Sequence, residues 1–218
     1  RALMLGQEPL DLLPQASKDI RAHAMNSLGV THYYLGDMVE AARMCAEAGE
    51  LARQAGNLYL VMAAATYRAK ALVCRGQLRQ AGHTLAQALS LSNPPDRPGQ
   101  SRIPAASVAC ASYGRLFYEW NRLEEAESYL DEAIELGQHL AFGSALWSAY
   151  HTLARIRVVQ GDRDGALGML ERAQRYRESH SVPLPAALMA AELAQTRLAL
   201  GQREAAERWA RTSAPDRL

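Results

Sequence analysis

The side chains of this 218-residue chain that could hold a metal ion include six histidines and three cysteines. A zinc site built on a helix needs ligands on one face, for example two histidines four residues apart beside a carboxylate. His23 and His32 are nine residues apart, and His139 and His151 are twelve apart, so the sequence contains no such pair. We therefore expect no metal ion and no cofactor in this chain.

Nucleophilic catalysis is no better supported by the sequence. The chain has an odd number of cysteines, which are Cys45, Cys74 and Cys110. They lack metal-ligand spacing and lie within helical patterns, so we expect buried, reduced thiols of a cytosolic protein. No serine, cysteine or threonine stands in a nucleophile-elbow motif, and no acid pair stands in an apolar segment. We expect a binding protein and no enzyme activity.

The charge and hydropathy of the chain exclude two further classes of partner. The net charge is +1, with arginine and glutamate interspersed, which is unlike the basic stripe of a nucleic-acid-binding surface. No apolar run is long enough to cross a bilayer, and no signal-peptide pattern is present. We predict a cytoplasmic location, without direct contact to nucleic acid or membrane.

One segment carries a cluster of acidic residues: Glu124, Glu125, Glu127, Asp131 and Glu132. We interpret this cluster as a solvated helix face, with binding of a basic partner segment as the alternative.

The elements that position all these side chains are set by an internal repeat. Five times, a helical stretch ends at Gly or Asn, and an Ala follows five residues later. The five instances are Gly36 to Ala41, Gly76 to Ala81, Asn121 to Ala126, Gly161 to Ala166 and Gly201 to Ala206. Steps of 40, 45, 40 and 40 residues indicate an array of helical pairs, none of which can bury its apolar face alone.

Apolar periodicity predicts an all-α chain of antiparallel helix pairs. The expected helices cover residues 17–35 and 38–54, 58–74 and 78–91, 103–120 and 123–136, 144–160 and 163–179, and 184–200 and 203–212. The corresponding repeats are 17–57, 58–100, 101–142, 143–182 and 183–218, after a partial repeat at 1–16. We interpret the chain as one repeat domain and a fragment of a longer protein, with two domains divided at the Pro-rich loop 92–99 as the alternative.

Small residues flank each turn at fixed distances. Seven residues before the turn stand Gly29, Ala69, Gly114, Ala154 and Ala194, and five residues after it stands an Ala. Such side chains let the two helices of a pair approach closely, while Leu85, Leu130 and Leu170 fill the space between layers. Trp120, Trp147 and Trp209 are also expected to pack between repeats.

These positions resemble the tetratricopeptide repeat, which has a small residue at its eighth position and Ala at its twentieth. Leu28-Gly29 with Gly36 and Ala41 fits this pattern, as does Gly114 with the segment 123–126. The repeat here is 40 residues long instead of 34 and lacks the usual terminal proline. This longer period, and the sequences of four segments, resemble the helical-repeat domain of one family of regulators. The segments are 12–14, 55–57, 75–81 and 161–173. The family is that of the maltose-regulon activator (MalT)-like, large ATP-binding LuxR-type regulators.

The resemblance implies a right-handed superhelix that receives an inducer and influences self-association. In that family a nucleotide-binding module precedes the repeats and a LuxR-type helix-turn-helix follows them. Neither a phosphate-binding Gly-rich loop nor a basic helix-turn-helix is found in these 218 residues, so both modules are expected outside them.

In such a superhelix the first helix of each pair lines a concave groove. Transferring the groove-facing positions of the repeat gives polar and aromatic candidates from four pairs: His23, Asn26, Tyr33, Tyr34, Thr66, Lys70, Arg115, Tyr118, Glu119, Trp147, Ser148 and His151. A sugar would favour Tyr33, Tyr118 and Trp147, whereas a peptide carboxylate would favour Lys70 and Arg115. The alternative is that these residues form only a solvated inner face.

Two functions of different kinds follow from this interpretation. The first is an effector-sensing and oligomerisation domain of a bacterial LuxR-type transcriptional regulator, with a small molecule or protein in the groove. The second is an adaptor that holds a partner peptide in the same groove. An enzyme accessory domain is a third and weaker alternative.

The repeat register predicts the effect of a large side chain at Ala166. Replacing Ala166 with Leu should overpack the helix pair and lower the free energy of unfolding by about 1–3 kcal/mol. Chemical denaturation of the two proteins measures this difference. Equal stabilities would show that the register is wrong.

Overall fold

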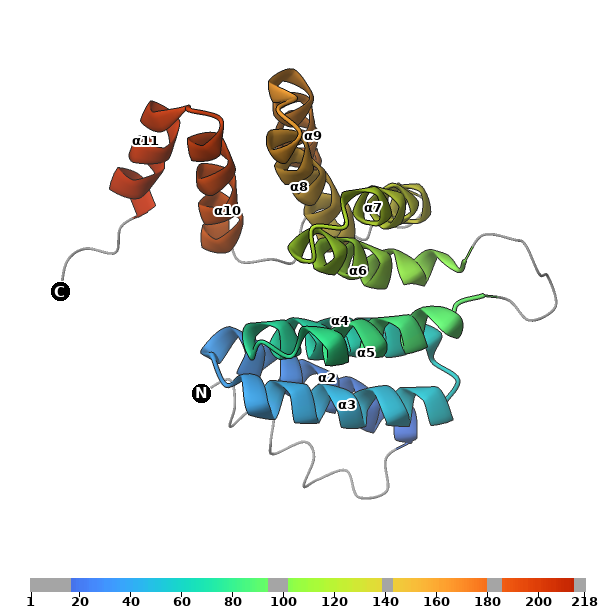
Figure 1. The fold of residues 1–218 in the computed structure, drawn as a ribbon. Coiled ribbons are helices and arrows are strands. Elements are labelled where there is room, and N and C mark those ends of the chain that lie inside the picture. Colours follow the sequence, from blue (N-terminus) through green and yellow to red (C-terminus); the bar gives the residue numbers. More distant parts are fainter. Residues whose placement is uncertain (1–16, 94–101, 139–142, 180–185, 214–218) are drawn as a thin grey trace.

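The computed structural model describes residues 17–93, 102–138, 143–179 and 186–213, and within these ranges it contains helices and no strand. Figure 1 shows the helices as successive antiparallel pairs along a curved path. The α-helices are α2 (Lys18–Leu35), α3 (Met38–Gln54), α4 (Leu58–Cys74), α5 (Leu78–Ser90), α6 (Ser107–Glu119), α7 (Leu123–Gln138), α8 (Gly143–Val159), α9 (Arg163–Ser179), α10 (Ala186–Ala199) and α11 (Arg203–Ser213).

Helices α3, α4 and α9 begin and end where periodicity predicts. The largest difference lies before α6, where a 3₁₀ turn, η1 (Pro104–Ala106), replaces the first residues of the predicted helix. Ile103 is extended, with φ −60° and ψ 145°, because a residue before proline avoids the helical region. The partial repeat predicted at 1–16 and the loop at 94–101 lie outside the described residues.

The recurring Gly or Asn is explained by the turn within each pair. Gly36, Gly76, Gly161 and Gly201 have φ between 73° and 88°, and Asn121 takes the same left-handed conformation with φ 56°. In the first turn the Gly36 N–H donates to the carbonyl of Tyr33, and the next N–H donates to the carbonyl of His32. This satisfies carbonyls that the helix end would leave unpaired. Asp37 then caps α3 by accepting from the N–H of Glu40 at 3.1 Å.

The small residues allow the two helices of a pair to touch through their backbones. A Cβ atom on Gly29 of α2 would lie 2.5 Å from Cys45 Sγ and 3.3 Å from the carbonyl oxygen of Ala41 in α3. On Gly114 of α6 it would lie 2.6 Å from Leu130 Cγ of α7. Nothing larger than a hydrogen atom fits at either position, so the pattern of small residues follows from the close approach of the helices.

Neighbouring pairs are joined by clusters of buried apolar side chains. Leu85 and Leu130 belong to one cluster and Leu170 to a second, and all three are buried as the register predicts. Trp120 packs between pairs, where its ring end would be 2.7 Å from a Cβ on Gly82 of α5. Trp147 of α8 is also buried. The side chain of Trp209 lies outside the described residues.

Two expectations about polar and thiol groups need correction. Cys45 and Cys110 are buried, but Cys74 is exposed because it is the last residue of α4, beside the turn. The acidic cluster on α7 is not wholly solvated. Glu132 pairs with Arg102, and Glu127 accepts from Arg157 of α8 at 2.9 Å, so these two carboxylates join segments about 30 residues apart.

The close helix contact at Gly114 predicts a large effect of one methyl group. Gly114→Ala should lower the free energy of unfolding by about 1–3 kcal/mol, because Leu130 and the carbonyl oxygen of Ala126, 3.0 Å from the added carbon, must move. Gly168→Ala on α9 is the matched control, since its added carbon meets nothing within 4 Å. The control should stabilise the protein by up to about 1 kcal/mol through helix propensity. Urea denaturation that ranked the two variants the other way would contradict this packing.

Candidate ligand-binding site

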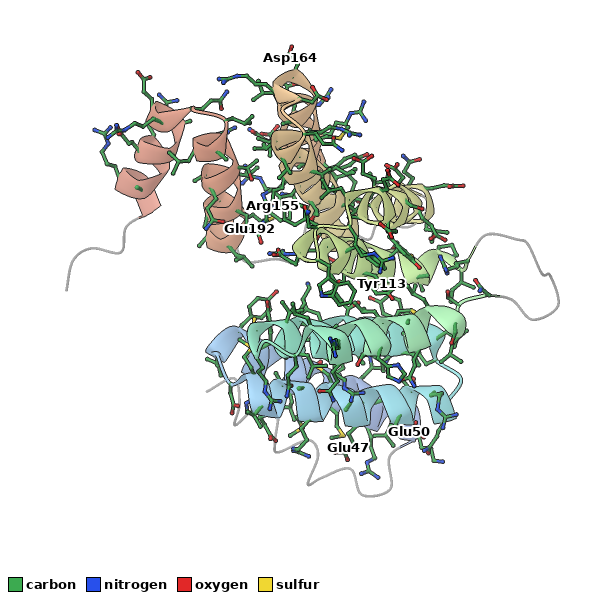
Figure 2. The ribbon with its side chains drawn as sticks, viewed as in Figure 1. Glu47, Glu50, Tyr113, Arg155, Asp164 and Glu192 are labelled. Atoms are coloured by element: carbon green, nitrogen blue, oxygen red, sulfur yellow. The ribbon has the colours of Figure 1, made fainter. Side chains whose placement is uncertain are left out.

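A cavity of about 210 Å³ lies where the first helices of the five described pairs meet. Tyr33 and Tyr34 come from α2, Lys70 from α4, Arg115 from α6, Trp147 from α8 and Glu192 from α10. In Figure 2 the labels of Arg155 and Glu192 lie together at the junction of α8 and α10. The site therefore depends on residues up to 159 positions apart in the chain (33 to 192).

Seven of the twelve groove residues predicted from the sequence line this cavity: Tyr33, Tyr34, Lys70, Arg115, Glu119, Trp147 and Ser148. The remaining wall is mostly small or apolar and was not predicted: Ala69, Val73, Cys74, Leu85, Ser112, Leu116, Ser144 and Leu188, with Glu192 as its one further charged residue. The cavity wall thus combines charged and apolar side chains.

The other five predicted residues lie outside the cavity. His23 is exposed and 3.9 Å from Asp19, and Tyr118 is covered by Arg155, whose guanidinium carbon is 4.4 Å from the ring centroid. Thr66 and His151 are buried between helices. Asn26 is half-buried on α2, with its Oδ1 atom buried and unpaired. Thr66 and His151 depart from the transferred groove positions because adjacent helices pack over them more tightly than an open groove allows.

Lys70 is a half-buried cation without a carboxylate partner among the described residues. Its Nζ atom lies 4.9 Å from the centroid of the Tyr67 ring. Burial, with a smaller contribution from Arg115, lowers the pKa of the Lys70 ammonium from 10.5 to about 8, and Glu192 partly opposes this change. Burial also raises the pKa of Tyr33 to about 12, so the neighbouring phenol stays neutral.

Glu192 links α10 to two other helices. Its Oε1 atom accepts from Arg115 Nη1 of α6 at 3.0 Å, and its Oε2 atom lies 3.8 Å from His151 Nδ1 of α8. The other ring nitrogen of His151 lies 3.0 Å from the backbone carbonyl oxygen of Glu192. Burial lowers the pKa of His151, which favours the neutral ring. Arg115 therefore carries the positive charge that faces Glu192.

Trp147 and His151 form a stacked pair on α8, with ring centroids 5.1 Å apart and planes inclined by 11°. The Trp147 side chain is 2% exposed, and its Nε1–H has no acceptor among the residues described. A buried donor without a partner costs free energy. The sequence shows that Trp147 and His151 are four residues apart on one helix. It does not show that the indole N–H of Trp147 lacks an acceptor.

The described ranges contain no group of three His, Cys, Asp or Glu side chains able to hold a metal ion. Likewise, none of the helices described is long and apolar enough to cross a membrane.

Solved structures with this arrangement of helices define the class of protein. Cut9-Hcn1 of the APC/C is similar with a TM-score of 0.69 and 17% identity, over 98% of this chain and 37% of that one. BtubC (BKLC) from P. vanneervenii gives 0.63 and 20%, over 98% and 86%. A Rap protein complexed with Competence and Sporulation Factor gives 0.66 and 14%, over 95% and 66%. The chain is a right-handed superhelix of tetratricopeptide-like helix pairs, as predicted.

Sequence comparison then gives the family. The family described as MalT-like TPR region matches residues 1–217, and the chain belongs to this family. HTH-type transcriptional regulator MalT from Serratia proteamaculans (strain 568) is 23% identical over 170 residues. The protein of the same name from Yersinia pestis (strain Pestoides F) is 22% identical over 170 residues. Each match covers 78% of this chain and 18% of the relative, so the chain spans less than a fifth of their length.

The environment of Lys70 predicts how its ammonium group titrates. The sequence contains two lysines, so ¹³C-lysine labelling gives one side-chain signal for Lys70 and one for the exposed Lys18 as a reference. The Lys70 signal should titrate near pH 8. Because this pKa is below the unfolded value of about 10.4, the free energy of unfolding should rise with pH between the two, and Lys70→Met should abolish that rise. A Lys70 midpoint near 10.4 would contradict the described burial.

Proposed function

We propose that this chain is the effector-sensing and protein-interaction region of a bacterial LuxR-type transcriptional regulator. Membership of the MalT-like TPR family and the transcriptional regulators among its relatives support this assignment. In this proposal the region acts in the cytoplasm by binding, without catalysis, cofactor, or direct contact to DNA or membrane. The DNA-binding and nucleotide-binding parts belong to other regions of the regulator.

The observation that carries the sensing role is the composition of the cavity wall. The first helices of five consecutive described pairs, together with Leu85 of α5, contribute side chains to one cavity. A ligand held there contacts the whole array at once and stabilises one curvature of the superhelix over others. A ligand shifts such an equilibrium by its difference in affinity for the two states. The altered curvature would change self-association or contacts with the attached modules.

The alternative function is an adaptor that holds a partner peptide in the same cavity. One observation favours it: the similar Rap protein is complexed with Competence and Sporulation Factor in its structure. Both functions use the inner face, and they differ in the size and identity of the ligand. The charged residues Lys70 and Arg115 would matter for a peptide with a free or acidic end.

Titration calorimetry of the chain with a metabolite panel tests the sensing role. We expect one class of small molecule to bind with 1:1 stoichiometry, and Ser148→Trp, which fills the cavity, to abolish binding. Ser128→Trp is the matched control, since this exposed serine on α7 lies outside the cavity. Affinity capture with wild-type chain and with Lys70→Glu or Arg115→Glu tests the adaptor. Loss of a captured protein in both variants, without any small-molecule binding, would favour the adaptor and contradict sensing.

A further inference from the structure

We propose that the cavity binds a small organic monoanion, a carboxylate on an apolar body, with its charged end between Lys70 and Arg115. This inference rests on the proposed sensing function and specifies the chemical class of the effector. It depends on three features of the cavity: its unpaired donors, its charge balance and its apolar wall.

The charged residues of the cavity wall offer more N–H donors than the wall offers acceptors for them. Lys70 has three N–H donors and no carboxylate partner among the described residues, and it lines the same cavity as Arg115. Arg115 uses Nη1 for Glu192 and keeps further N–H groups for a second acceptor. An oxyanion supplies the acceptor that these two side chains lack.

The charge balance favours one negative charge on the ligand. Lys70 and Arg115 contribute two positive charges, and Glu192 offsets one of them. Glu119 also lines the cavity, but its carboxylate is 3.5 Å from Arg155 Nη1 and is balanced by it. One positive charge is left uncompensated. A monoanion neutralises it, whereas a dianion would leave a net negative charge beside Glu192 in a partly buried site.

The apolar wall indicates what the carboxylate is attached to. Ala69, Val73, Leu85, Leu116 and Leu188 line the same cavity, and Leu188 on α10 is 40% exposed. An apolar chain or ring placed against them would remove this surface from water, which favours binding. The volume of about 210 Å³ suits a molecule with a short acyl chain or a single aromatic ring.

Glu192 provides a way for such a ligand to act on the array. The ligand carboxylate would bind the same guanidinium group of Arg115 as the Glu192 carboxylate, and the two negative charges would repel each other. A bound acid that takes over Arg115 weakens the direct link between α6 and α10. Binding and the position of the last helix pair are thereby coupled.

Calorimetry with matched acids and amides tests the ligand class. The probes are hexanoate and 4-phenylbutyrate, with hexanamide and 4-phenylbutyramide as neutral isosteres. We expect the acids to bind about ten-fold or more tightly than the amides, the size of effect that one charge-assisted hydrogen bond gives. On binding, the ¹³C signal of Lys70 should show a raised pKa, because the carboxylate favours the charged ammonium. Equal affinities of acid and amide, or no binding of either, would overturn the inference.

Variants locate the site. Lys70→Met and Arg115→Gln should each weaken acid binding about ten-fold, and Glu192→Gln should strengthen it by removing the competing charge. Arg68→Gln is the control, because Arg68 lies on the same helix as Lys70 but lines a different groove, beside Cys45 and Arg53. Circular dichroism of each variant establishes that it is folded. Acid binding that is insensitive to Lys70→Met and Arg115→Gln would contradict this site.

The outcomes separate this inference from the proposed function. One such outcome is binding of a neutral oligosaccharide that Ser148→Trp abolishes and Lys70→Met leaves unchanged. This result would support the sensing role and overturn the proposal of a monoanionic ligand. A pentapeptide with a free carboxyl end and an apolar last residue is a further probe. Binding of this peptide, but not of its amidated form or of the free acids, would assign the same chemistry to a partner protein and overturn the small acid.

Discussion

The close approach of the two helices in each pair is the constraint on which the rest of this structure depends. At Gly29 and Gly114 the partner helix leaves no room for a single added carbon atom. The left-handed residue between the helices, Gly or Asn121, reverses the chain within a short turn. This short turn keeps the two helices of the pair close together. Since every pair is built alike, the pairs stack in register and their first helices come to lie side by side.

The candidate site is a product of this stacking. Lys70, Arg115, Trp147 and Glu192 occur on four different helices, and none of them has a functional motif around it. They meet because α4, α6, α8 and α10 line one face of the array. Their chemistry follows from that meeting: burial removes water from Lys70, and Glu192 reaches Arg115 across 77 residues. A change in curvature would alter these contacts, as the proposed sensing role requires.

The sequence was sufficient to predict the helices, because Gly or Asn at each turn and Ala five residues later are requirements of short-range packing. It also identified Lys70, Arg115 and Trp147 as residues of the inner face. It did not identify Glu192, since its role depends on how far the last pair swings toward α6, which no local pattern encodes. The burial of Thr66 and His151 was missed for the same reason: the spacing between pairs is set by the side chains of both, and the repeat pattern describes only one pair at a time.

The central claim is that the inner cavity is the ligand site. A crystal structure of the chain with hexanoate tests this claim most directly. The account predicts carboxylate density between Lys70 Nζ and the Arg115 guanidinium, with the acyl chain along Leu116 and Leu188 and with Glu192 moved away from Arg115. An empty cavity that keeps the 3.0 Å contact between Arg115 and Glu192, in crystals saturated with the acid, would contradict it.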